Sequence, residues 1–387
     1  MQKLIKTQLA NIVSPYCRTT DVLEQRFTAL EGGAAAVAVS SGTAACFYAI
    51  VNVAQAGDNF VSARNLYGGT YTQFNDIISK FGITAKFVDI TDPEAVKAAI
   101  DSKTRAIFCE TCSNPALEIS PLDELAAIAN EAEIPLIVDD TFTTPALCKP
   151  IDHGAAVVCH SLTKWSGGHG TGIGGIIVDS GKFDWTKNPL FTEPDTSYGG
   201  LRWGLDLPEP LQPIAFALRF RTVPLRNLGA CIAPDNSWMF LQGLETLPLR
   251  MERHCENAEK VALFLKDHPK VEWVRFPGLK EDPEYEKNVK YFGGKGGSLV
   301  VFEVKGGAEE GKTFIDGLKL FSHVANVGDA KSLAINPATT THSQLNEEQQ
   351  RLCGITPGLI RLSVGIETID DILADLKQAL HVGEVQL

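Results

Sequence analysis

The chain has 387 residues, a formal net charge of −12, 44% hydrophobic residues and 21% charged residues. This length suits two domains better than a single core. No basic patch favours nucleic acid, and no apolar stretch reaches the roughly 18–20 residues that a membrane-spanning helix needs. Residues 1–13 lack the apolar segment of a signal peptide, and the nine cysteines lack regular spacing. We therefore expect a cytoplasmic protein with reduced thiols.

Short apolar runs alternate with helical patterns between residues 33 and 180. Near-continuous apolar strands separated by helices predict an α/β domain with a mainly parallel sheet that is covered on both faces. The seven predicted strands are 35–39, 59–62, 84–89, 105–110, 135–139, 155–160 and 174–178. The helices predicted between them are 43–54, 71–81, 93–100 and 121–132.

The pattern changes in the second half of the chain. Residues 184–203 are rich in Pro, Gly, Thr and Asp and predict a long loop. Residues 235–237, Asp-Asn-Ser, predict an N-cap that opens a long helical pattern over 238–266, interrupted at Pro248. Predicted strands at 271–276, 298–304 and 359–364 and helices at 312–321 and 369–379 follow. We expect an N-terminal arm (1–20), a large α/β domain (21–234) and a smaller α+β domain (235–387).

Three short motifs match binding signatures without the right context. Residues 170–175 fit GxGxxG but precede a predicted strand, whereas a dinucleotide site follows one. Residues 306–313 match a P-loop, yet Glu309 and Glu310 would place carboxylates beside the phosphates, so we interpret the segment as a turn and helix start. Cys109 and Cys112 are three residues apart at a strand end, which directs them to opposite faces and argues against a redox pair.

A lysine with two neighbouring hydroxyls follows the predicted strand 155–160. The residues are Ser161-Leu-Thr163-Lys164, and the glycine-dense segment 167–175 comes next. Ligands of open α/β sheets bind at the carboxyl ends of the strands, and glycines let the backbone approach a ligand closely. A single lysine is most often a solvated surface residue; here its neighbours favour a reactive amine.

Two further strand ends carry polar residues. Asp139 ends the strand 135–139, and an acid there is costly unless it meets a cation, although capping of the next turn would also explain it. Residues 40–43, Ser-Ser-Gly-Thr, follow the first strand and open a helix. A helix start with glycine and hydroxyls predicts either a plain N-cap or, with Ser161 and Thr163, a phosphate site.

Residues 161–175, SLTKWSGGHGTGIGG, and the Asp139–Lys164 spacing resemble the pyridoxal-phosphate enzymes of cysteine and methionine metabolism. The resemblance runs from about Tyr16 to the C-terminus. It implies the aspartate-aminotransferase-like (type I) fold and pyridoxal 5'-phosphate as cofactor. It also implies a homotetramer, built as a dimer of dimers with shared active sites, and no metal in the site.

The resemblance assigns roles to residues at the cofactor. It implies that Lys164 forms the Schiff base and later moves protons, and that Asp139 pairs with the pyridine nitrogen. Tyr67 would stack on the ring and accept a proton from the substrate amine. The phosphate would be held by four residues: Gly42, Thr43, Ser161 and Thr163.

The resemblance also covers the substrate and a second subunit. Asn114 and Arg361 would bind the substrate carboxylate, a task suited to the guanidinium fork. Taken singly, each has a plain structural explanation as a turn residue or a surface charge. Tyr16 and Arg18 match the family's Tyr-x-Arg, which reaches the phosphate of the neighbouring subunit. About four residues of the family pattern are absent after Arg18, so we expect the N-terminal arm to be incomplete in this sequence.

Three reactions of the family compete. They are γ-replacement on an acylated homoserine with sulfide, γ-replacement with cysteine, and γ-elimination of methionine or cystathionine. Asn326, in Asn-Val-Gly-Asp-Ala-Lys, and the long loop 184–203 resemble the sulfhydrylase branch and favour sulfide, with O-acetylhomoserine as the amino-acid substrate. A non-catalytic regulator with this fold would carry an added DNA-binding domain, for which the chain has no room.

Overall fold

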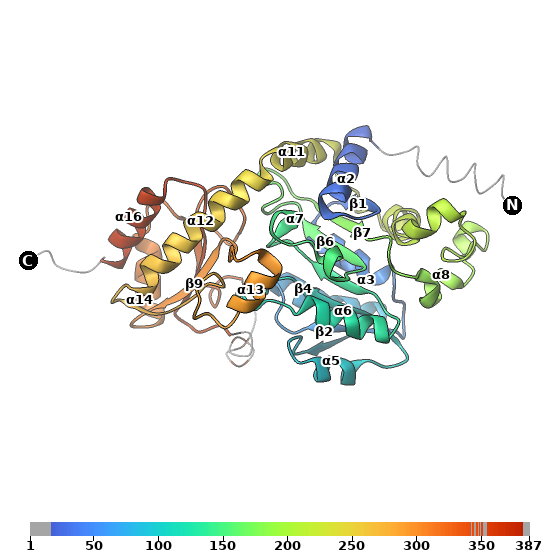
Figure 1. Ribbon diagram of the computed structural model, residues 1–387, viewed down its shortest axis with the longest axis horizontal. Coiled ribbons are helices and arrows are strands. Elements are labelled where there is room, and N and C mark those ends of the chain that lie inside the picture. Colours follow the sequence, from blue (N-terminus) through green and yellow to red (C-terminus); the bar gives the residue numbers. More distant parts are fainter. Residues whose placement is uncertain are drawn as a thin grey trace, which may run out of the picture.

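The computed structural model describes residues 17–341, 343, 346, 348, 350 and 354–381. The described part contains a seven-stranded sheet and a five-stranded sheet, each covered by helices. Figure 1 shows the two sheets on opposite sides of the molecule, with the long helix α12 (Leu247–Lys266) running away from the larger one. Tyr16 and the rest of the predicted N-terminal arm up to that point lie outside the described residues.

The larger sheet has the strand order β1-β7-β6-β5-β4-β2-β3. Neighbouring strands are parallel except β7, which runs antiparallel to both β1 and β6. This confirms the predicted mainly parallel sheet, with all seven strands close to their expected positions. The strands are β1 (Ala35–Val39), β2 (Asn59–Ala63), β3 (Thr84–Val88), β4 (Thr104–Glu110), β5 (Leu136–Asp139), β6 (Val157–Ser161) and β7 (Gly175–Asp179).

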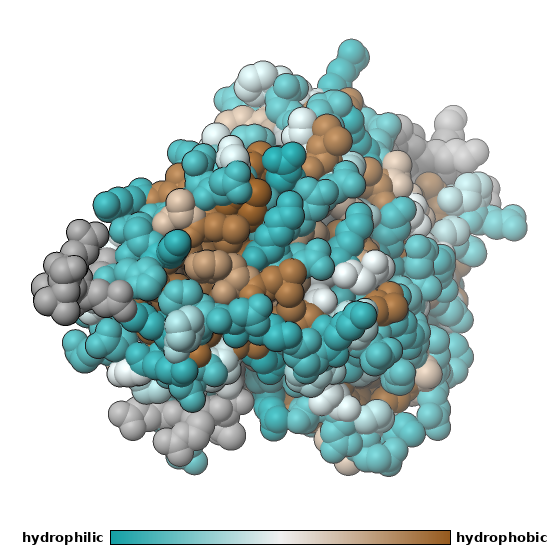
Figure 2. Space-filling view, turned by 60° about the vertical axis from the view of Figure 1, so that its left-hand side comes forward, coloured by the Kyte–Doolittle hydropathy of each residue, from teal (hydrophilic) through white to brown (hydrophobic). Residues whose placement is uncertain are grey.

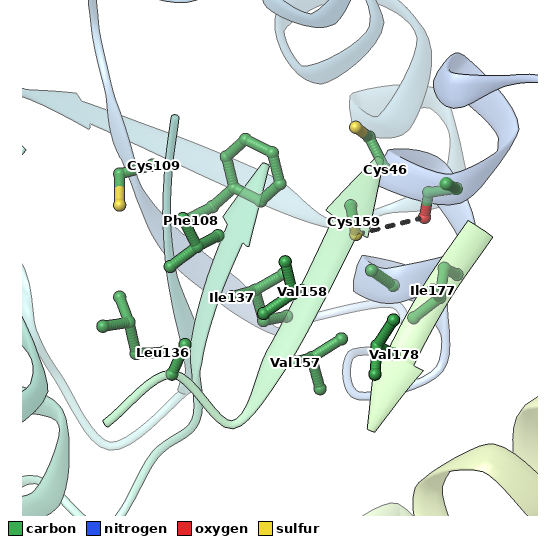
Figure 3. Packing of buried hydrophobic residues seen from close by; sticks show 14 of the residues in the cluster. Cys46, Phe108, Cys109, Leu136, Ile137, Val157, Val158, Cys159, Ile177 and Val178 are labelled. Atoms are coloured by element: carbon green, nitrogen blue, oxygen red, sulfur yellow. Dashed lines mark hydrogen bonds between the residues drawn. The ribbon is translucent and has the colours of Figure 1, made fainter. Parts of the chain in front are cut away.

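The centre of this sheet is an apolar core in which strand side chains interdigitate with helices. Figure 3 shows the packing of β4 to β7, where Ile137, Val158 and Val178 are fully buried. The thiol of Cys159 on β6 donates to the carbonyl of Ala45 at 3.9 Å, which links the sheet to the helix that covers it. Strands buried on both faces need continuous apolar sequence, which explains why they are visible as apolar runs.

Helices pack on both faces of the large sheet. Helix α3 (Gly42–Val51) contacts β6 and β7, and α6 (Leu122–Glu131) contacts β4 and β5. The helix predicted at 71–81 is wrong as a single α-helix, because the segment divides into three short pieces: α4 (Gly68–Thr72), the π-helix η1 (Gln73–Ile77) and the 3₁₀-helix η2 (Ile78–Phe81). The remaining elements here are α2 (Arg18–Glu31), α5 (Pro93–Ala99), α7 (Thr144–Leu147) and η3 (Pro150–His153).

Residues 184–203 are not one continuous loop. Side-chain caps from Asp184, Asn188 and Asp195 start short helical turns, and Trp203 anchors the segment by donating to Asp195 at 2.9 Å. Helical turns also continue to residue 228, where the sequence patterns predicted none. These elements are η4 (Trp185–Lys187), α8 (Pro189–Thr192), η5 (Thr196–Tyr198), η6 (Glu209–Ile214), α9 (Ala215–Phe220), η7 (Arg221–Leu225) and α10 (Arg226–Leu228).

The smaller sheet has the order β10-β11-β12-β9-β8. The three predicted strands are present, and two short ones, β10 and β11, were missed because they are too short to show a period. A separate apolar cluster fills this part, with Val300, Phe302 and Ile360 fully buried. The elements are β8 (Val271–Arg275), β9 (Leu299–Val304), β10 (Ser322–His323), β11 (Leu333–Ile335), β12 (Leu359–Ser363), α13 (Tyr285–Phe292), α14 (Ala308–Gly317) and α16 (Ile369–Leu380).

The long helical pattern after residue 234 is two helices. Helix α11 (Pro234–Glu245) begins earlier than predicted, with Pro234 in its first turn and Ala233 at the N-cap, so the expected Asp-Asn-Ser cap is wrong. The helical geometry is interrupted at Thr246, between the two helices. Pro248 lies in the first turn of α12, where its missing N–H is tolerated. Helix α14 likewise starts four residues before the predicted 312, so the P-loop-like segment is a turn and helix start.

Helix α12 belongs to both cores. Leu247 and Met251 pack in the large cluster, whereas Ala258, Val261 and Leu265 pack in the small one. Among the described residues no helix is both long and apolar enough to cross a membrane. Figure 2 shows one face of the molecule, largely hydrophilic, with hydrophobic residues gathered near its centre.

Candidate active site

A pocket of about 930 Å³, including its open mouth, lies where the carboxyl ends of the large sheet face the smaller sheet. Asp139 and Ser161 are the last residues of β5 and β6, and Glu110 is the last residue of β4. Parallel strands end at one edge, which is why side chains far apart in sequence meet there. The pocket is lined by Ser41, Gly42, Thr43, Cys46, Tyr67, Thr70, Glu110, Cys112, Asn114, Asp139, Thr141, Phe142, Ser161, Thr163, Lys164, Ile173, Ala325, Asn326, Val327, Thr341 and Arg361.

Close backbone packing builds one end of the pocket. A Cβ on Gly42 would lie 2.5 Å from the Cβ of Ser161, and one on Gly175 would lie 2.1 Å from the carbonyl oxygen of Ser41. Only glycine allows the start of α3 to approach the strand ends so closely. The Ser41 side chain caps α3 by accepting from the Ala44 amide at 3.0 Å. The result is a helix start beside the Ser161 side chain, suited to an anion.

Asp139 is fixed through one of its two carboxylate oxygens. Oδ1 accepts from the Thr141 amide at 3.0 Å and from the Thr141 hydroxyl at 2.6 Å. Oδ2 accepts from the Cys46 thiol at 3.4 Å. Because Asp139 lines the pocket and a thiol is a weak donor, Oδ2 has capacity for a stronger hydrogen bond from a cationic donor in the pocket.

Lys164 lies at the centre of the lining residues. Burial, and to a smaller extent the nearby cation of Arg361, lower the pKa of its amine to about 8. Its Nζ donates a hydrogen bond to Oδ1 of Asn326. An amine with this pKa is partly neutral near physiological pH, and only the neutral amine is a nucleophile or a base.

A buried guanidinium shares the partner Asn326 with Lys164. Arg361 on β12 is 2% exposed. Its Nη1 donates to Oδ1 of Asn114 at 2.7 Å and its Nη2 donates to the carbonyl of Asn326 at 3.2 Å. The buried Nε has no hydrogen-bond partner. A buried donor without a partner is costly, so this geometry fits a ligand carboxylate that binds the fork.

Tyr67 borders the pocket mouth from the loop after β2. Its backbone amide donates to Oε1 of Glu110 at 2.7 Å, and its side chain is 43% exposed. Burial raises the pKa of Glu110 well above its usual range, and the neighbouring Asp139 carboxylate acts in the same direction. Gly69 passes so close to the Tyr67 ring that a Cβ there would lie 2.6 Å from Cε1. The backbone hydrogen bond and the close approach of Gly69 thus hold a half-exposed ring at the pocket.

Ten of the predicted site residues line this one pocket. They are Gly42, Thr43, Tyr67, Asn114, Asp139, Ser161, Thr163, Lys164, Asn326 and Arg361. Arg18 is exposed at the start of α2 and is not among the pocket residues of this chain, and Tyr16 is outside the described part. No described residue of the segment 184–203 lines the pocket either.

Sequence reasoning missed several contributors. Cys46, Glu110 and Thr141 line the pocket and contact Asp139 or Tyr67. Glu110 and Thr141 could have been found, because each stands at or just after a predicted strand end. Cys46 lies one turn into α3 and carries no comparable signal. Cys112 lines the pocket whereas Cys109 is in the core, and both are free thiols, as expected for residues that do not pair.

Comparison with known proteins matches residues 15–381 to the family described as Cys/Met metabolism PLP-dependent enzymes. The chain belongs to this family. It is 52% identical over 369 residues to O-acetyl-L-homoserine sulfhydrylase of Leptospira meyeri, covering 94% of this chain and 84% of that protein. Homocysteine synthase of Schizosaccharomyces pombe is 49% identical, with 94% and 85% covered.

The fold agrees with solved members of the family. A Campylobacter jejuni structure described as an O-acetylhomoserine (thiol)-lyase with N'-pyridoxyl-lysine-5'-monophosphate matches with a TM-score of 0.90. Its sequence is 43% identical, with 94% of this chain and 86% of that chain covered. The chain is therefore a pyridoxal-phosphate enzyme with the aspartate-aminotransferase-like fold.

The residues of the pocket fit pyridoxal phosphate. The crowded glycine cradle at Gly42 and Gly175 offers the start of α3 to a phosphate. Asp139 Oδ2 is the oxygen left for a protonated ring nitrogen. Lys164, with its lowered pKa, is an amine of the kind that such a cofactor needs.

Proposed function

We propose that this enzyme makes L-homocysteine and acetate from O-acetyl-L-homoserine and sulfide, a γ-replacement. One observation carries the proposal: Lys164, Asn326, Arg361 and Asn114 form a continuous chain of hydrogen bonds inside the pocket. A carboxylate clamp next to a reactive amine fits an α-amino acid. The two relatives named above, with 49–52% identity, support the choice of acylated homoserine and sulfide.

At the cofactor, we assign Lys164 to the Schiff base and Asp139 to the ring nitrogen. When bound, pyridoxal phosphate withdraws electrons from the substrate carbon through its protonated ring. Thr141 orients Asp139 through two hydrogen bonds to Oδ1, which leaves Oδ2 for the ring. Tyr67, which lines the pocket, would cover the ring. The phosphate is assigned to Gly42, Thr43, Ser161 and Thr163.

Lys164 is also the group that moves protons on the substrate carbon chain. Burial, and to a smaller extent the Arg361 cation, lower the pKa of the free Lys164 amine to about 8, so part of it is neutral and can accept the α-proton. Asn326 holds Nζ through Oδ1, which fixes the amine at the side of the pocket where the substrate carboxylate binds. The same amine returns the proton after sulfide has replaced acetate at the γ-carbon.

Arg361 and Asn114 orient the substrate. The guanidinium binds the α-carboxylate, while Asn114 holds Nη1 in place. The burial of Arg361 lowers its pKa to about 10, so it stays cationic at neutral pH. Small sulfide needs no further binding group, whereas cysteine would bring a second carboxylate and an amine, for which the described lining offers no second buried guanidinium.

We also propose that two chains build each site, within a tetramer made of two such dimers. Tyr67 is 43% exposed and Ile173 is 62% exposed at the pocket, as expected for residues covered by a second subunit. Arg18, exposed and outside its own pocket, is available to a partner's phosphate. The buried free thiols support a cytoplasmic enzyme.

A substrate assay tests the function. Purified enzyme with O-acetylhomoserine should form homocysteine with sulfide and much less cystathionine with cysteine at equal concentration. Acetyl-, succinyl- and phospho-homoserine compared side by side identify the acyl group. Comparable cystathionine formation would assign γ-synthase activity instead, and release of methanethiol from methionine as the dominant reaction would assign a γ-lyase.

A further inference from the structure

A second group of ionisable side chains lies behind the pocket. Glu31 ends α2, Asp140 follows β5, and His160 is the penultimate residue of β6. All three are 0% exposed. His160 Nε2 lies 3.0 Å from Oε2 of Glu31, and one nitrogen or oxygen atom from each residue lies within 4.8 Å of the others. The Phe27 ring packs edge-on against the His160 ring, with the two ring centroids 4.8 Å apart.

Two carboxylate oxygens in this group lack hydrogen bonds. Asp140 Oδ1 accepts from the hydroxyls of Thr111, at 2.8 Å, and Thr143. Asp140 Oδ2 and Glu31 Oε1 are buried and have no partner. Two buried carboxylates that were both ionised would repel each other, and each would leave an oxygen unsatisfied. A single proton or positive charge within the cluster would relieve both the repulsion and the unsatisfied oxygens.

The surroundings do not supply that charge. Burial lowers the pKa of His160, which favours a neutral imidazole despite the nearby Asp139 and Asp140. Lys149 lowers the pKa of Glu31, and Asp152 raises it, but burial dominates and the net direction is upward. Burial raises the pKa of Asp140 as well. The thiol of Cys148, also next to these acids, has a raised pKa and is neutral.

We propose that Glu31, Asp140 and His160 hold one shared proton, carried on Oδ2 of Asp140 and donated to Oε1 of Glu31, and that this cluster positions the cofactor-binding ends of β5 and β6. A neutral His160 donates from Nε2 to the other oxygen of Glu31. A carboxylic acid that donates to a carboxylate satisfies both orphan oxygens with a single proton. The cluster then carries one negative charge, in place of the two that ionised Glu31 and Asp140 would bring together.

The link to the cofactor runs along the backbone. Asp140 follows Asp139, and His160 precedes Ser161. Thr141 joins the two strand ends on the pocket side, because its hydroxyl donates to Asp139 at 2.6 Å and accepts from the Ser161 amide at 2.8 Å. The cluster ties the same two ends together on the opposite side. Its members are positioning residues, and this part of the inference rests on the proposed function, whereas the shared proton does not.

The proton can be observed directly in holoenzyme at pH 7. Hydrogen–deuterium difference infrared spectra should show the carbonyl stretch of a protonated carboxylic acid, and Asp140→Asn should remove it. The control is Asp179→Asn, because Asp179 is a second buried acid whose pKa burial raises to about 7; this variant should keep the Asp140 band. A band that persists in Asp140→Asn would overturn the shared proton. Elemental analysis that finds one metal ion per chain, lost in Asp140→Asn and Glu31→Gln, would overturn it in favour of a metal centre.

Kinetics test the positioning role. Asn supplies a permanent donor at the same place, so Asp140→Asn should keep kcat/KM and cofactor affinity within about twofold of wild type. Asp140→Ala should weaken cofactor affinity by roughly tenfold, the effect of losing one buried hydrogen bond. If Asp140→Ala does not accumulate, Asp140→Asn alone decides: a large loss of cofactor affinity in it would overturn the positioning role. A wild type with the infrared band but no homocysteine formation would refute only the proposed function.

Discussion

Replacing Arg361 with lysine tests the central interaction of the proposed site. The guanidinium is 2% exposed and donates to Asn114 Oδ1 at 2.7 Å and to the Asn326 carbonyl at 3.2 Å, while its Nε lacks a partner. Lysine keeps the positive charge but has no planar fork. Arg361→Lys therefore removes the bidentate contact to a substrate carboxylate while leaving the electrostatic attraction largely in place.

The expected loss follows from the contact removed. A hydrogen bond to a charged group contributes about 1.5–3 kcal/mol. Losing one of two such bonds should lower kcat/KM by roughly 10- to 150-fold, since about 1.4 kcal/mol corresponds to a factor of ten. Most of the loss should appear as a higher KM, because the carboxylate is bound equally before and during the reaction. Arg361→Ala should lose more, since a buried carboxylate would then be unpaired.

Steady-state assays with O-acetylhomoserine and sulfide measure both constants. Arg219→Lys is the matched control, because Arg219 is also buried, donates to Asn52 Oδ1 at 2.8 Å and does not line the pocket. It should lower thermal stability and leave KM unchanged. A wild-type KM in Arg361→Lys, or an equal rise in KM in Arg219→Lys, would refute the assignment of Arg361 to the carboxylate.

Three further predictions address the cofactor and the assembly. Apoenzyme should take up pyridoxal phosphate faster as pH rises, half-maximally near pH 8, because the pKa of Lys164 is lowered to about 8 and only the neutral amine reacts. Arg361→Gln should raise the pH of half-maximal uptake, because a nearby cation is removed. Half-maximal uptake by wild type near the pKa of an ordinary lysine would contradict the lowered pKa of Lys164. Asp139→Ala should weaken cofactor binding and slow turnover, seen by absorbance titration and assay; wild-type values would exclude it as the ring partner. Lys164→Ala and Arg18→Ala should each be nearly inactive alone. Co-refolded as random dimers, they should regain up to about one quarter of wild-type activity, because a mixed dimer contains one site with both wild-type residues. No recovery in demonstrated mixed dimers would place Arg18 outside any shared site.

Much of the large sheet could be predicted because most of its strands are buried on both faces, the partly exposed edge strand β3 being the exception. Buried strands must be apolar throughout, so they stand out as runs between helical patterns. The polar residues that end them, Asp139 and Ser161, were visible for the same reason, and parallel strands bring their ends to one edge. The helical segments around residues 71–81 and 205–228 could not be predicted correctly, because they contain π- and 3₁₀-turns, which follow no simple apolar period.

The sequence alone determined the α/β class of the large sheet and the polar residues at its strand ends, because both depend on local patterns of apolar and polar residues. The cofactor and the role of Lys164 were predicted from the resemblance of residues 161–175 to a known family. Only the tertiary structure decided which distant residues meet. Arg361 reaches Asn114 across 247 positions, and His160 reaches Glu31 across 129. Such contacts depend on how β12 faces the large sheet and how α2 covers it. Local periodicity says which face of an element is buried, but the packing of complementary surfaces selects the partner.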